Sequence, residues 1–139
     1  MAVMIIMMMV QPMVWANMNF DSSFYNKLSE LHNKKFDWKT NNCGLFVGEV
    51  LKLMYNRDFN HTFMSDYSDE KSAFDYIQNK GGWHSVLSSV GLKKRENDTI
   101  CVGDVVICEK AIGIFDGNNA LFAGGAFRRR NKITEAYYI

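Results

Sequence analysis

The sequence has almost no excess charge, no closely spaced pair of cysteines and no long apolar run. Its 16 Lys and Arg residues oppose 15 Asp and Glu residues, which gives a formal net charge of +1. A chain this balanced has no long-range field that would attract DNA, RNA or an anionic membrane. We therefore expect neither nucleic acid nor a membrane as a partner.

The N-terminal region also lacks the features of a membrane span and of a secretion signal. Its apolar stretch covers only residues 2–10, whereas a membrane-spanning helix needs about 20 apolar residues. No basic residue precedes this stretch, as one would in a signal peptide. We expect that the protein is not secreted through a clear signal peptide.

The three cysteines have no CxxC spacing, and their odd number leaves one of them unpaired in any arrangement of disulfides. This usage favours a reducing compartment, in which Cys43, Cys101 and Cys108 are all thiols. A zinc site would have to collect four ligands from separate segments. The glycines form no phosphate-binding loop. We expect no metal and no cofactor.

The length of 139 residues fits one domain, because domains commonly contain roughly 100 to 200 residues. The composition is uneven at the start, where 7 of the 9 methionines lie from Met1 to Met18. Translation that begins at Met18 would explain this bias, although Met1 stays open as the start. We expect residues 1–17 to be an extension of doubtful structural role and residues 18–139 to form a single domain.

Capping residues followed by apolar residues at helical spacing predict four helices. They are expected at about residues 24–33, 43–55, 69–80 and 83–90. The second helix has the clearest apolar face, and Asn42 directly precedes it. In the third helix we expect Ser68 to be the cap and Ala73, Phe74 and Ile77 to form the inner face.

Beyond residue 104 the pattern changes to short β-branched or aromatic segments that are separated by turn residues. We expect strands at residues 105–108, 112–115, 120–122 and 133–139, with a turn at 116–119. Helices followed by strands indicate an α+β fold, in which an N-terminal helical half packs on a C-terminal antiparallel sheet.

Cys43 is the first candidate for chemistry because it falls in the first turn of the second helix. The unpaired N–H groups at a helix start carry partial positive charge, which lowers the pKa of a nearby thiol and favours the nucleophilic thiolate. The alternative is that Cys43 is a small core residue on an apolar helix face. The residue alone does not separate these interpretations.

Three short motifs extend the pattern around this cysteine. They are Asn42-Cys43-Gly44, then Gly103-Asp104-Val105-Val106, then Ala111-Ile112-Gly113-Ile114-Phe115. Their order resembles the NlpC-type branch of the papain-like cysteine peptidases. The resemblance implies a papain-like fold with Cys43 at the position of the nucleophile. In that family a histidine opens the last of these motifs and acts as the general base, whereas this chain has Ala111. A methyl group cannot accept the thiol proton, so the usual dyad is lost.

The sequence is also similar to a small domain family of unassigned function that is encoded in bacteriophage and prophage tail-gene clusters. The matches occur in the order Trp38, Asn42-Cys43, Phe46-Val47, Asn56-Arg57-Asp58, Gly81-Gly82, Gly103-Asp104, Ile112-Gly113-Ile114 and Ala136-Tyr137. This resemblance implies a tail-associated protein, with other phage tail proteins as partners. It also implies a location in the virion tail or the bacterial host cytoplasm.

Two functions of different class follow from these resemblances. In the first, the domain is catalytically degenerate and serves a structural or adaptor role. In the second, it is an active cysteine peptidase or amidase on peptide or cell-wall amides, with Cys43 as nucleophile and a non-standard base. His32, His61 and His84 are the available imidazoles. His61 is the best placed of them, because its loop directly follows the Cys43 helix.

Two basic runs complete the candidate features. Lys93-Lys94-Arg95 and Arg128-Arg129-Arg130, the latter with Lys132, are expected at turns between elements. Solvated loops are the ordinary interpretation of such runs. If both lie on the same face, they could bind phosphate or an acidic partner.

Overall fold

The computed structural model describes residues 20–59, 68–96 and 99–139 of the chain. The expected extension at residues 1–17 and the candidate base His61 lie outside these residues. Within the described part, no helix is long and apolar enough to cross a membrane.

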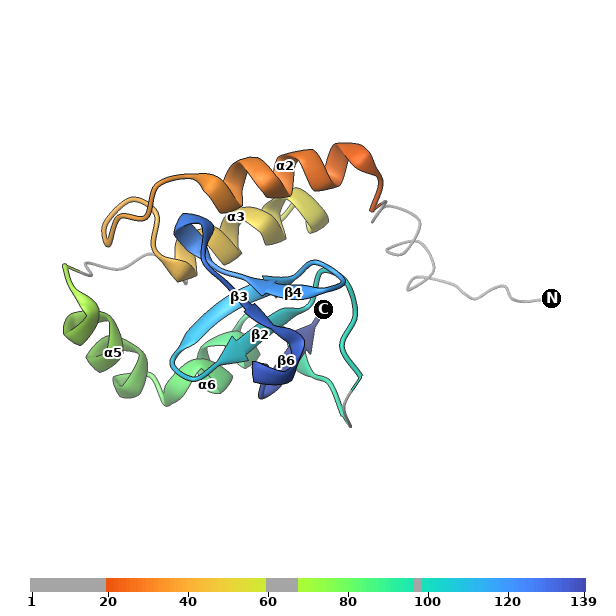
Figure 1. Cartoon of the computed structure of the whole chain (residues 1–139). Coiled ribbons are helices and arrows are strands. Elements are labelled where there is room, and N and C mark those ends of the chain that lie inside the picture. Colours follow the sequence, from red (N-terminus) through yellow and green to blue (C-terminus); the bar gives the residue numbers. More distant parts are fainter. Residues whose placement is uncertain (1–19, 60–67, 97–98) are drawn as a thin grey trace.

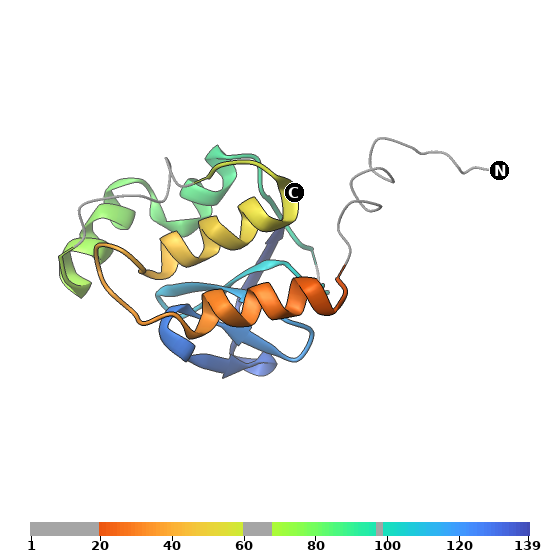
Figure 2. The same ribbon diagram turned by 90° about the horizontal axis from the view of Figure 1, so that it is seen from above.

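Four helices are described, and all four were expected. They are α2 (Ser22–Asn33), α3 (Cys43–Tyr55), α5 (Glu70–Asn79) and α6 (Gly82–Ser89). Side-chain caps define the starts of the first two, because Asp21 accepts a hydrogen bond from the Phe24 N–H and Asn42 accepts one from the Leu45 N–H. Figures 1 and 2 show α2 and α3 running side by side across one side of the sheet.

Helix α5 differs from expectation in its cap and its inner face. Asp69, and not Ser68, is the N-cap, and it forms a reciprocal capping box with Ser72. Only Ile77 is buried in this helix, whereas the Phe74 side chain is 39% exposed. The Lys110 ammonium group instead lies over the Phe74 ring, 4.7 Å from the ring centroid. Since the helix packs at the periphery, Ile77 is its one buried side chain, and the half-buried Tyr76 packs against the same core.

The strands form one antiparallel sheet of six strands in the order β1-β6-β2-β3-β4-β5. Their bounds are Lys93–Lys94 for β1, Val105–Cys108 for β2, Ala111–Phe115 for β3, Asn119–Leu121 for β4, Phe127–Arg129 for β5 and Glu135–Tyr138 for β6. The expected α+β class is therefore confirmed, with helices on an antiparallel sheet.

The two outermost strands were missed by the sequence analysis. The basic runs, which were expected at turns, partly form β1 and β5, and a 3-10 turn η2 (Arg130–Lys132) follows β5. Every residue of β1 and β5 is exposed. Charged residues without apolar alternation are typical of short edge strands that protect a sheet from further pairing. Such strands carry no periodic signal in the sequence.

The sheet separates two apolar clusters. The helix-side cluster contains buried residues of α2, α3, α5 and α6 together with alternate sheet positions such as Ile112, Ile114 and Tyr137. The second cluster has no buried helix residue, and it consists of Val106, Cys108, Phe115, Ala120, Phe122 and Ala136. The period of two along each strand distributes the side chains between these clusters.

Gly103 of the Gly103-Asp104 motif and Gly113 of the Ile112-Gly113-Ile114 motif permit close contacts with neighbouring segments. Gly103 has a φ of +89°, and a Cβ there would lie 2.7 Å from the Met54 side chain at the end of α3. A Cβ at Gly113 would overlap the carbonyl oxygen of Leu121 and lie 2.9 Å from the Phe122 ring. These glycines let α3 and the chain around β4 approach the central strands.

Asp104 is buried and forms a bidentate ion pair with Arg95. The Arg95 Nε and Nη2 groups donate to its two carboxylate oxygens over 2.8 and 3.0 Å, and the Cys101 N–H donates to the same carboxylate over 2.9 Å. The hydrogen bonds to Asp104 raise the pKa of Arg95. Bidentate arginine–carboxylate pairs of this kind are strong and fix geometry. The pair joins β1 to the loop that precedes β2.

Replacing Asp104 with asparagine should destabilise the fold by about 2–3 kcal/mol, because the half-buried Arg95 guanidinium would keep its charge and lose its partner. Urea unfolding followed by circular dichroism measures this loss. Asp75→Asn is the matched control, since the Lys71–Asp75 pair lies on an exposed helix face and should contribute almost nothing. An equal loss of unfolding free energy in both variants would contradict the role of Asp104.

Candidate functional site

The segment before α3 is held by buried amide side chains. The Asn41 amide donates to the carbonyl oxygens of Lys34 and Lys35, both over 3.0 Å. The Asn42 amide donates to the Trp38 carbonyl over 2.8 Å, while its oxygen accepts from the Leu45 N–H over 2.9 Å. Asn42 is only 1% exposed. The first residue of α3 therefore has a fixed position, and that residue is Cys43.

Cys43 is half-buried and contacts both apolar clusters. Burial raises the pKa of its thiol, and a hydrogen bond from the backbone of Ala123 lowers it by less. The net direction is upward, which is opposite to the lowering that we expected at a helix start. A thiol with a raised pKa is protonated at neutral pH and is a poor nucleophile.

Ala111 is the first residue of β3, where it pairs with Cys108 across the hairpin. It is half-buried and packs against the second cluster, which Cys43 also contacts. Helix α3 packs on strand β3. The thiol and the position at which the resemblance expects a base therefore both contact the same apolar cluster. The side chain at that position is a methyl group, which cannot move a proton.

His32 forms a hydrogen bond with the segment that precedes β5. Its Nε2 lies 2.9 Å from the carbonyl oxygen of Ala126. Since a carbonyl oxygen only accepts, Nε2 carries a proton and donates. This nitrogen is therefore not available as the base for Cys43.

His84 belongs to a separate hydrogen-bonded chain. Its Nδ1 lies 2.7 Å from the Tyr137 hydroxyl, which in turn donates to the Glu135 carboxylate over 2.6 Å. Because the hydroxyl proton is used by Glu135, Nδ1 of His84 is the donor. Burial and the Glu135 carboxylate raise the pKa of Tyr137. This chain links α6 to β6, and the sequence analysis did not find it, since residues 84, 135 and 137 meet only in the folded molecule.

The other two thiols show no arrangement for chemistry. Cys108 is buried, and desolvation raises its pKa although the positive charge of Arg128 lowers it. Cys101 is half-buried, and its backbone N–H binds Asp104. Among the described residues, no group of three or more His, Cys, Asp or Glu side chains could hold a metal ion.

The fold and the site together define an α+β domain with a half-buried thiol at a helix start, and neither His32 nor His84 is hydrogen-bonded to that thiol. The model of a family described as a domain of unknown function (DUF6950) matches residues 17–139. The chain therefore belongs to this family. No curated protein and no solved structure matches it.

The raised pKa of Cys43 predicts slow alkylation at neutral pH. In a Cys101→Ser, Cys108→Ala background, iodoacetamide should modify the folded protein more slowly than the urea-unfolded protein at every pH below about 8.5, where an ordinary thiol ionises. The folded protein should accelerate only at higher pH, because burial disfavours the thiolate. Mass spectrometry of timed samples measures both rates. Rapid modification of the folded protein near pH 6 would refute this assignment.

Proposed function

We propose that this domain is a catalytically degenerate relative of the NlpC-type papain-like cysteine peptidases and serves as a structural or adaptor component of a phage or prophage tail. The observation that carries the loss of catalysis is that Cys43 and Ala111 both pack against the second apolar cluster. A general base has to lie within hydrogen-bond reach of the proton that it removes. The alanine side chain at position 111 carries no group that could accept a proton.

The geometry of the described histidines supports this proposal. His32 donates to Ala126, and His84 belongs to the Tyr137 chain. The raised pKa of Cys43 agrees with a structural role, because burial stabilises the neutral thiol. The tail association itself is supported by the ordered resemblance from Trp38 to Tyr137, and its partners would be other tail proteins.

A histidine placed at position 111 tests the proposed kinship with the peptidases. In Ala111→His an imidazolium would lie beside the thiol and favour its ionised form. We expect alkylation of Cys43 near pH 7 to accelerate by about tenfold, which corresponds to one pKa unit.

Ala111→Gln is the matched control, since glutamine is similar in size and does not titrate. It should leave the alkylation rate almost unchanged. Thermal melting of both variants shows whether they remain folded. Equal rates in two folded variants would mean that position 111 does not face the thiol, and the relation to the peptidases would be lost.

A structural role predicts that the assembly of infectious particles needs the gene but does not need the Cys43 thiol. Deletion of the gene from its phage or prophage should abolish the assembly of infectious particles. A Cys43→Ala allele should restore plaque counts to within about twofold of the wild type, because alanine fills a similar apolar site. Electron microscopy of the particles shows whether tails are present.

The opposite result would favour the alternative function, an active cysteine peptidase or amidase. If Cys43→Ala behaves like the deletion, although the purified variant folds and melts like the wild type, then the thiol is used chemically. The domain would then be a cysteine peptidase or amidase with a base other than residue 111.

A further inference from the structure

Parts of the two basic runs form the opposite edges of the sheet, because β1 and β5 are the first and last strands in its order. Within the described part of the chain, β5 (Phe127–Arg129) pairs with β4 alone. Figure 2 shows the blue chain around β5 at the border of the molecule, next to α2. An extended segment of another protein can add to such an edge through backbone hydrogen bonds.

The register of the β4–β5 pair shows which backbone groups of β5 face outward. The Phe122 N–H donates to the Ala126 carbonyl oxygen over 2.9 Å, and hydrogen-bonded pairs alternate with non-bonded pairs along an antiparallel ladder. Counted from this pair, Arg128 is hydrogen-bonded to β4, whereas the N–H groups of Phe127 and Arg129 point away from β4. The edge therefore presents two donors that are two residues apart.

Two guanidinium groups accompany these donors. Within the described residues, no carboxylate forms an ion pair with Arg128 or Arg129. The Arg128 Nη1 group donates to the Phe127 carbonyl oxygen over 2.9 Å, which occupies that acceptor and leaves the positive charge. Because successive side chains of a strand lie on opposite faces, the two cations would flank an added strand on both of its faces.

Phe127 gives the same edge an apolar contact. Its side chain is 54% exposed, which is the largest exposed fraction among the large hydrophobic residues of the described part. Phe127 pairs with Leu121, which belongs to the helix-side cluster. Since paired residues lie on the same face of a sheet, the ring lies on the helix side of β5. A side chain of an added strand would cover it there.

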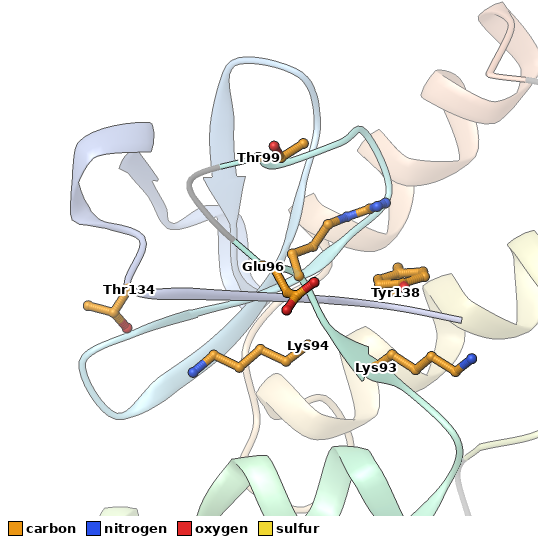
Figure 3. A pocket seen from close by; sticks show the side chains of 7 residues that line it. Lys93, Lys94, Glu96, Thr99, Thr134 and Tyr138 are labelled. Atoms are coloured by element: carbon orange, nitrogen blue, oxygen red, sulfur yellow. The ribbon is translucent and has the colours of Figure 1, made fainter.

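The opposite edge of the sheet lacks this combination. The Lys94 ammonium group lies 3.5 Å from the Glu135 carboxylate, and Arg95 is paired with Asp104. Figure 3 shows Lys93 and Lys94 pointing to opposite sides of β1. The strand has only 2 residues and contains no aromatic side chain. Unpaired charge and exposed apolar surface therefore coincide at β5.

The charge of β5 selects the kind of strand that can add to it. If β5 paired with the same strand of a second copy, arginine would lie opposite arginine, and like charges in opposed positions destabilise a sheet. The arginines thus protect the edge from self-association. The same charges attract a strand that carries carboxylate side chains.

We propose that β5 is a docking site for an extended acidic segment of a partner protein, which adds to the sheet as a further strand. The carbonyl oxygens of this segment accept hydrogen bonds from the N–H groups of Phe127 and Arg129. Its carboxylates lie opposite Arg128 and Arg129, and an apolar side chain contacts the Phe127 ring. This interaction depends neither on the reactivity of Cys43 nor on the association with a tail.

A labelled peptide that alternates threonine and valine around a central Glu-Glu-Phe sequence, blocked at both ends, tests the site. In antiparallel register it places the two glutamates opposite Arg129 and Arg128 and its phenylalanine opposite Phe127. Titration of the full chain, followed by fluorescence anisotropy, should show saturable binding with a dissociation constant on the order of 100 μM. A control peptide with Gln-Gln-Phe at its centre should bind about fivefold more weakly, because it lacks the cross-strand charge pairs.

Two substitutions of Arg129 separate its charge from its N–H group. Arg129→Gln should weaken binding of the acidic peptide by about threefold, because it removes the charge alone. Arg129→Pro should weaken binding by about fivefold more, because a hydrogen bond is also lost. The backbone of Arg129, with φ −70° and ψ 156°, already suits proline, which edge strands tolerate where the N–H faces outward.

Lys93→Gln is the matched control, since it removes one exposed positive charge from the other edge strand. It should change the affinity by less than about twofold. Thermal melting shows whether all three variants remain folded. Equal weakening by Lys93→Gln and Arg129→Gln would exclude β5 as the site.

Amide hydrogen exchange of the wild-type chain, measured by NMR, gives a result that needs no substitution. The acidic peptide should slow exchange of the Phe127 and Arg129 N–H groups and leave that of Arg128 unchanged, because Arg128 is already bonded to β4. Two outcomes would overturn the proposal. One is the absence of saturable binding up to about 1 mM peptide, well above the expected dissociation constant. The other is binding without slower exchange at Phe127 and Arg129, which would show attraction to a basic surface without strand addition.

Discussion

The buried ion pair between Asp104 and Arg95 is the constraint on which much of the sheet depends. The Asp104 carboxylate fixes Arg95 next to β1 and the Cys101 N–H before β2. The backbone carbonyl oxygen of Asp104 accepts a hydrogen bond from the Phe115 N–H at the end of β3. A charge this deeply buried is tolerated only when its partners satisfy it.

The second constraint is the fixed start of α3. Asn42 closes the first turn and places Cys43 between two apolar clusters, where burial opposes ionisation more than the Ala123 hydrogen bond favours it. A working cysteine peptidase needs the opposite balance together with a base. A half-buried thiol is compatible with the lack of a base at position 111, because a cysteine that transfers no proton can be packed as an ordinary small apolar side chain.

Local signals explain which elements could be predicted. Helices α2, α3 and α6 and the four inner strands follow from caps, apolar periodicity and turns, all of which act within a few residues. Strands β1 and β5 could not be found in this way, because their exposed lysines and arginines form strands only by pairing with β6 and β4. The predicted N-cap of α5 was wrong by one residue. Ser68 and Asp69 can both cap a helix, and only the reciprocal hydrogen bonds with Ser72 select Asp69.

The sequence by itself determined the helix start at Cys43, the α+β class and the alanine at position 111, because these depend on residue identity and short-range periodicity. Only the tertiary structure decided the direction of the thiol pKa and the hydrogen-bond partners of His32 and His84. Burial and hydrogen-bond partners are properties of segments that are distant in the chain. They arise when the sheet closes against the helices, and no local pattern encodes them.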